Sequence, residues 1–173
     1  ASDRGADSLP GLFGSSAALM GAPGADDGAG RVLAIAFGGR PIHYHLSGME
    51  LAGGPVGRFG HAILNVGHIG NDTAVHWAVG APGNGAGGPP SAVVVLHGEG
   101  NRLAERLRVE ASPEARLGFA LVAAENDRTD SLVDHFVVSA PGEANGSRPA
   151  AGALHRISAI SGSVVWTLLG GGR

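Results

Sequence analysis

Three short stretches of the chain bring together residue types that can do chemistry. His43-Tyr44-His45 places two imidazoles on one face of an extended segment, as a zinc site would need, but no third ligand is evident in the sequence. Asp26-Asp27 could hold a cation or act in acid-base catalysis, although paired acids between two short strands are more often turn residues. Asp134-His135 joins an acid to an imidazole, yet successive strand residues point to opposite faces. None of these stretches predicts a complete catalytic or metal site.

The sequence also lacks the segments that usually accompany such groups. No Gly-x-Ser-x-Gly segment presents a nucleophilic serine, and the absence of cysteine excludes disulfides and thiolate metal sites. Glycine-rich stretches such as residues 83–88 do not open a helix, which argues against a phosphate-binding loop. We therefore expect no enzyme activity from this chain.

Composition limits the partners. All twelve basic residues are arginines scattered along the 173 residues, and the formal net charge is −3. Nucleic acids and anionic membrane surfaces are therefore poor candidate partners. The apolar runs are far shorter than the ~20 residues of a membrane-spanning helix, so no membrane span is expected. The 31 glycines and 10 prolines interrupt the chain too often for long helices and predict many short strands.

A repeat sets the positions of these residues. Three apolar runs each end in the same three-residue motif, which is a small residue followed by alanine and proline. The copies are Gly21-Ala22-Pro23, Gly80-Ala81-Pro82 and Ser139-Ala140-Pro141, and each lies 59 residues after the one before. The segment Arg58–Leu64 is matched 58 residues later by Arg116–Val122. Anchors that recur in one order at one period are typical of a repeated structural unit.

Each unit is predicted to hold four antiparallel strands. The strands cover 59–66, 74–80, 91–97 and 102–109 in the middle unit, and 117–124, 132–138, 153–160 and 163–169 in the last one. Inner strands are apolar throughout, which indicates burial on both faces, whereas 102–109 alternates aliphatic residues with arginines, as in a half-solvated edge strand. The opening unit is incomplete, with residues 17–20, 31–37 and 41–47 but no full first strand. Such units describe blades of a β-propeller, and a sandwich or barrel is the alternative.

The anchors also resemble a known family. Phe59-Gly60 followed by Gly80-Ala81-Pro82-Gly83 is similar to the FG-GAP repeat of integrin α-subunit propellers and related extracellular proteins, and the resemblance covers nearly all of residues 11–169. It implies an all-β fold in which 1–173 is a single repeat domain. That domain would be a partial β-propeller of about three four-stranded antiparallel blades, at 11–53, 54–111 and 112–173, with the first blade incomplete.

The resemblance further implies a calcium loop between first and second strands, similar to Asp-x-Asp-x-Asp-Gly-x-x-Asp. This register leaves four weak metal candidates, which are Asp72 in the middle unit and Asp127, Thr129 and Ser131 in the last one. Calcium needs six to eight oxygen ligands, and neither loop offers enough of them to bind the ion. We therefore expect no resident metal or cofactor. His76 and His135 stand where the last aspartate of the loop would be. We expect them to replace the ion by reaching back to Asp72 and to Asp127 or Thr129 respectively.

Two segments match the acceptor pattern for N-glycosylation. They are Asn71-Asp72-Thr73 and Asn145-Gly146-Ser147, and both fall in predicted exposed loops. Together with the integrin-like family, they favour an extracellular or cell-surface location.

The predicted function is that of a non-catalytic adhesion or assembly module, which presents its loops to another protein or a glycan. Because a propeller needs at least four blades to close, we expect another protein chain or further copies to complete the ring. Two alternatives stay open. The chain could be an accessory propeller segment of a larger enzyme, such as a glycosylphosphatidylinositol-cleaving phospholipase, or a structural subunit of a surface assembly.

Overall fold

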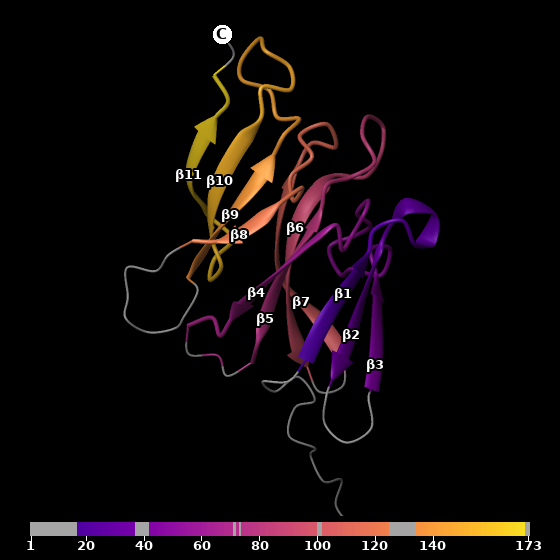
Figure 1. Ribbon diagram of the computed structural model, residues 1–173. Helices are drawn as coiled ribbons and strands as arrows, with labels where there is room; N and C mark the ends of the chain where they lie inside the picture. Colours follow the sequence, from indigo (N-terminus) through magenta and orange to yellow (C-terminus); the bar gives the residue numbers. More distant parts are fainter. Residues whose placement is uncertain are drawn as a thin grey trace, which may run out of the picture.

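The chain folds into three antiparallel sheets that follow one another in sequence (Figure 1). The computed structural model describes residues 17–36, 42–70, 72, 74–99, 102–124 and 134–171. Within these residues there are eleven strands, and the single helical element is the short 3-10 turn Asp26–Gly28. The fold is therefore all-β, as the glycine and proline content predicts.

Each sheet is a simple up-and-down meander. Sheet 1 has the order β1 (Ala17–Ala22), β2 (Arg31–Ala36) and β3 (Ile42–Ser47). Sheet 2 has the order β4 (Ala62–Gly67), β5 (His76–Ala81), β6 (Ser91–Glu99) and β7 (Arg102–Ala111). Sheet 3 has the order β8 (Leu121–Ala123), β9 (His135–Ala140), β10 (Ala153–Ser158) and β11 (Val164–Leu169).

These sheets match the predicted units. Every predicted strand is present, and sheet 1 has three strands among the described residues. The largest difference is β8, which is limited to three residues where 117–124 was expected. The backbone N–H groups of Gly118 and Phe119 both donate to the Ser139 carbonyl, at 3.2 and 3.4 Å, so residues 117–120 form a turn instead of the start of the strand. The described strands form three sheets rather than the two of a sandwich.

The core lies in two layers, one on each side of sheet 2. Strand β5 is buried along its whole length, as expected for the inner strand of the middle unit, whereas β9 in the last unit alternates half-buried and buried residues. Trp77 and Val79 pack toward sheet 1 with Val32, while Ala78 packs toward sheet 3 with Phe136. Because successive strand residues point to opposite faces, one strand can serve both layers only if nearly all of its residues are apolar or small.

Glycine allows the sheets to approach closely at the two junctions. A Cβ at Gly21 would overlap the backbone carbonyl of Gly60 in the next unit, and a Cβ at Gly80 would overlap that of Gly118. Within sheet 2, the Gly80 carbonyl accepts hydrogen bonds from the N–H groups of Gly60 and His61, both at 3.1 Å, so Gly80 also holds the turn that opens its own unit. The small residue before Ala-Pro is therefore a docking point for the turn that opens the following unit.

One face of sheet 3 packs against sheet 2, and no described residue covers the opposite, outer face. Four apolar side chains on this outer face have exposed fractions between 40 and 61%, and they are Val122, Leu154, Trp166 and Leu168. The same face carries Ser139 in the position that Gly21 and Gly80 occupy in the first two sheets. Separately, no helix among the described residues is long and apolar enough to span a membrane.

Candidate functional site

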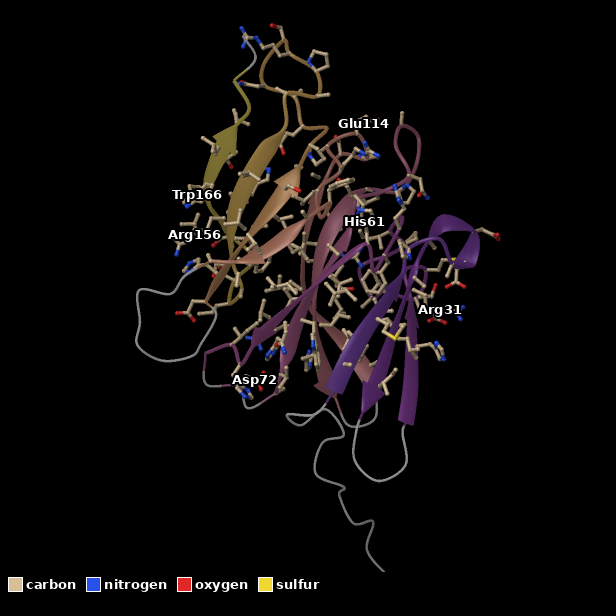
Figure 2. All side chains as sticks on the ribbon, viewed as in Figure 1. Arg31, His61, Asp72, Glu114, Arg156 and Trp166 are labelled. Carbon is tan, nitrogen blue, oxygen red and sulfur yellow. The ribbon has the colours of Figure 1, made fainter. Side chains whose placement is uncertain are left out.

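The strongest candidate for a binding site is a pocket formed where the loops of sheets 2 and 3 meet. Its volume is about 550 Å³. We call it the Arg58–Arg116 pocket, and its lining consists of Arg58, Gly83, Asn84, Gly85, Ala86, Glu114 and Arg116. Three segments contribute to it: the turn before β4, the loop after β5, and the turn between β7 and β8. Figure 2 shows Glu114 among the loops at the upper end of the molecule, far from Asp72 at the lower end.

The repeat brings two equivalent arginines, from successive units, into the lining of this pocket. Arg58 and Arg116 each precede a buried apolar residue and a turn glycine, and both have a φ of 58°. An L-residue in this left-handed region costs about 1–2 kcal/mol, so each arginine is held there by the turn around it. The Arg58 N–H donates to the Gly28 carbonyl at 2.8 Å, which ties this turn to the end of the 3-10 turn.

Neither guanidinium is neutralised by a carboxylate. Within the described part of the chain, no hydrogen bond or ion pair joins the Arg58 or Arg116 guanidinium to another residue, although the Arg116 group lies 5.7 Å from the centre of the Phe119 ring. The charges of Arg58 and Arg116 also act on the nearby His61. Burial, followed by the charges of Arg58 and Arg116, lowers the pKa of His61. The lining of the pocket itself carries two positive charges and one negative charge, from Arg58, Arg116 and Glu114.

The remaining polar groups of the pocket are Asn84 and Glu114. The Asn84 Nδ2 donates to the Gly28 carbonyl at 3.2 Å, and this bond fixes the loop after β5 against sheet 1. Glu114 is exposed and makes no ion pair among the described residues. In the sequence, Arg58 and Arg116 stand out only as anchors of the repeat. Their equal positions in two successive turns were the available signal, but no sequence pattern shows that two turns share a pocket.

A second polar cluster lies at the opposite end of sheet 2, where the resemblance placed a calcium loop. His76 is fully buried, and its Nε2 is 3.3 Å from Asp72 Oδ2. The Arg106 Nη1 donates to Asp72 Oδ2 at 3.0 Å and contacts His76 Nε2 at 3.1 Å. Because arginine can only donate, His76 Nε2 must be the acceptor, and His76 Nδ1 donates to the Gly67 carbonyl at 3.3 Å. This tautomer is neutral. Burial, and then the charge of Arg106, lowers the pKa of His76.

This cluster agrees in part with the prediction from the sequence. His76 does lie within 3.3 Å of Asp72, but in this tautomer its Nε2 has no proton to donate. The group that joins the two and neutralises Asp72 is Arg106, on the strand expected to be a half-solvated edge. Hydrogen bonding to the Ala74 N–H at 2.9 Å also lowers the pKa of Asp72. No group of three or more His, Asp or Glu side chains among the described residues is arranged to hold a metal ion. Asp127, Thr129, Ser131 and Asn71 lie outside the described residues.

The other stretches that the sequence singled out have ordinary surroundings. Asp26 Oδ2 accepts hydrogen bonds from Arg31 Nε at 3.1 Å and from Ser47 Oγ at 2.7 Å, and the Arg31 bond is the main reason why the pKa of Asp26 is lowered. Asp26 is thus a structural residue of its turn. The side chain of His43 lies outside the described residues. Asn145 Nδ2, the atom that would carry a glycan, donates to the Gly170 carbonyl at 3.3 Å.

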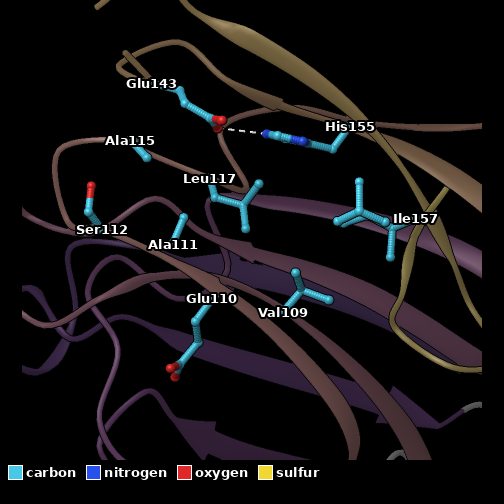
Figure 3. A pocket seen from close by; sticks show the side chains of 10 residues that line it. Val109, Glu110, Ala111, Ser112, Ala115, Leu117, Glu143, His155 and Ile157 are labelled. Carbon is cyan, nitrogen blue, oxygen red and sulfur yellow. Dashed lines mark hydrogen bonds and ion pairs between the residues drawn. The ribbon is translucent and has the colours of Figure 1, made fainter. Parts of the chain in front are cut away.

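A third feature was not predicted. Glu143 Oε2 is 2.7 Å from His155 Nε2, and His155 Nδ1 is 2.9 Å from Thr167 Oγ1. The Glu143–His155 pair borders a cavity of about 340 Å³ between β7 and sheet 3, otherwise lined mainly by small and aliphatic residues such as Leu117 and Ile157 (Figure 3). His155 stands at the place that Val94 has in sheet 2, so comparing the two units would have marked it as unusual.

Comparison with known proteins adds no functional information. No protein-family model matches this sequence, and no curated protein matches it.

Proposed function

We propose that this chain is a non-catalytic binding module that contacts its partner through the Arg58–Arg116 pocket. The observation that carries the proposal is the pair of repeat-equivalent arginines, which line one cavity and have no carboxylate partner among the described residues. Loops held by a rigid sheet scaffold are common sites of recognition. Arginine is also among the residues most enriched at the centres of interfaces.

We propose further that the three sheets are blades of a β-propeller of the FG-GAP type, found at the cell surface or outside the cell. Sheets of equal topology that pack face to face in sequence order support this architecture. The uncovered face of sheet 3 supports a partner chain or further copies that complete the ring, because an apolar face of this kind is normally buried. Used glycosylation sites at Asn71 or Asn145 would support the location.

A structural subunit of a surface assembly is the second candidate. On the outer face of sheet 3, Arg156 has a buried Nε without a hydrogen-bond partner among the described residues, beside the exposed Trp166 and Leu168. Exposed apolar side chains that gather on one face are normally covered, so this face is suited to contact another chain. If it does, the native mass exceeds that of one chain, and Leu168→Glu returns it to one chain. A wild-type mass equal to one chain would remove this candidate.

Binding of the fluorescently labelled chain to intact cells tests the main proposal. The double variant Arg58→Gln/Arg116→Gln is compared with Arg31→Gln, which removes the same type of charge from sheet 1, outside the pocket. We expect saturable binding that the double variant loses and Arg31→Gln keeps. Failure of the wild-type chain to bind, or binding that the double variant retains, would refute the module as proposed. Turnover of ester or glycoside substrates by the purified chain would refute its non-catalytic character.

A further inference from the structure

We infer that the ligand of the Arg58–Arg116 pocket is an acidic polysaccharide that carries sulfate or uronate groups. The inference rests on the proposed function and gives its binding site a chemical class of ligand. Its three supports are the charge of the lining, the fixed position of the arginines, and the kind of side chain that the lining lacks.

The charge of the lining favours an anion. Arg58 and Arg116 contribute two positive charges, and Glu114 contributes one negative charge. Each guanidinium presents parallel N–H donors that fit sulfate or carboxylate oxygens in a bidentate manner. Because neither group has a carboxylate partner among the described residues, an anionic ligand would not have to displace an existing ion pair.

The arginines are also held in place before any ligand arrives. Both lie in turns that pack against the preceding sheet, since Gly60 and Gly118 in these turns meet Gly21 and Gly80. A fixed backbone lowers the conformational entropy that is lost on binding. The repeat therefore fixes the two backbone positions from which the arginine side chains reach the pocket, and it supplies two cations for a ligand with several charges along its chain.

The lining favours a sugar over a protein segment. Energetically dominant sites in protein interfaces bury aromatic or large aliphatic anchors, whereas the uncharged lining residues here are Gly83, Asn84, Gly85 and Ala86. Amide and carboxylate groups such as those of Asn84 and Glu114 are suited to sugar hydroxyls. Phe119 lies beside the pocket with 40% of its surface exposed, but the Arg116 guanidinium and the His61 ring both lie against its ring. A cavity of about 550 Å³ has room for sugar rings.

Calorimetric titration of the purified chain with defined oligosaccharides tests the inference. The probes are a heparin-derived octasaccharide, a hyaluronan octasaccharide with carboxylates alone, neutral dextran of similar length, and a peptide of eight glutamates. We expect the heparin octasaccharide to bind and dextran not to bind. The hyaluronan probe then shows whether carboxylate alone suffices or sulfate is required.

The arginine variants and the glutamate variant of the pocket should change the binding affinity in opposite directions. Removing a hydrogen bond to a charged group costs about 1.5–3 kcal/mol, or at least about tenfold in affinity. Arg58→Gln and Arg116→Gln should therefore each weaken binding about tenfold or more. Glu114→Gln should strengthen binding, because it removes the carboxylate nearest the anion. Arg31→Gln should change affinity less than about twofold, since the Arg31 charge is already paired with Asp26 and its side chain is not part of the pocket lining. Thermal unfolding of each variant shows that it is folded.

Three results would overturn the inference. They are the absence of binding to both acidic oligosaccharides, equal weakening by Arg31→Gln and the pocket variants, and arginine-dependent binding of the glutamate peptide alone. In each case the cell-binding experiment still decides the proposed function separately. Arginine-dependent binding to cells without binding to either oligosaccharide would leave the module standing and remove only the ligand class.

Discussion

Replacing Gly80 with alanine should destabilise the protein more than its small size suggests. The new Cβ would overlap the backbone carbonyl of Gly118 in the turn that opens sheet 3. A backbone atom cannot rotate away as a flexible side chain can, so the sheet itself has to shift. Gly80 does not have a left-handed φ, and alanine therefore adds no strain to its own backbone.

The expected size follows from two opposing effects. Overpacking in a close-packed interior costs about 1–3 kcal/mol, and contact with rigid backbone places Gly80→Ala near the upper end. Loss of the conformational freedom of glycine in the unfolded chain offsets about 0.4–1 kcal/mol. The net loss is about 2 kcal/mol, which corresponds to a fall in Tm of about 4–8 °C for a chain of this length.

Thermal and urea unfolding measure this change. Gly24→Ala is the matched control, because an added Cβ there meets no atom within 4 Å and its φ is also not left-handed. Gly21→Ala should behave like Gly80→Ala, since it meets Gly60 at the other junction. If Gly80→Ala were as stable as Gly24→Ala, sheets 2 and 3 would not pack through this contact, and the face-to-face arrangement would be refuted.

The cluster around Asp72 supports three further predictions. Arg106→Gln should lower the free energy of unfolding by about 1–3 kcal/mol, because it leaves a buried acceptor on His76 without its charged donor; an unchanged urea midpoint would contradict this. The pKa of His76 is lowered from 6.5 in the folded protein, so the unfolded chain binds more protons and the free energy of unfolding falls as the pH drops below about 6.5. His76→Gln should reduce that slope, which is at most about 1.4 kcal/mol per pH unit for one proton, and an equal slope in both proteins would argue against a neutral buried imidazole. Millimolar calcium should leave the Tm unchanged, since Arg106 already neutralises Asp72; a calcium-dependent rise would show that an ion binds instead.

The strands and their grouping could be predicted because the signals are local and repeated. Alternation of apolar residues, turn glycines and a constant period locate β5, β6 and their counterparts without any knowledge of tertiary contacts. The late start of β8 could not be predicted, because it depends on hydrogen bonds from Gly118 and Phe119 to Ser139, some twenty residues away in sequence.

The candidate sites were less predictable for the same physical reason. The loop register correctly indicated the contact between His76 and Asp72, which are four residues apart. Arg106 joins them from a strand 30 residues beyond His76, and only the pairing of sheet 2 shows it. The Arg58–Arg116 pocket depends on two turns from successive units that line one cavity, which no property of either turn reveals by itself.

The most direct measurement is an NMR titration that follows the Nε–Hε signals of the arginine side chains while the heparin octasaccharide is added. The proposed site predicts that the Arg58 and Arg116 signals shift with one common affinity, and that those of Arg31 and Arg108, which are held in ion pairs, stay in place. Shifts spread evenly over all arginines, or confined to arginines other than Arg58 and Arg116, would contradict a defined site between the two turns.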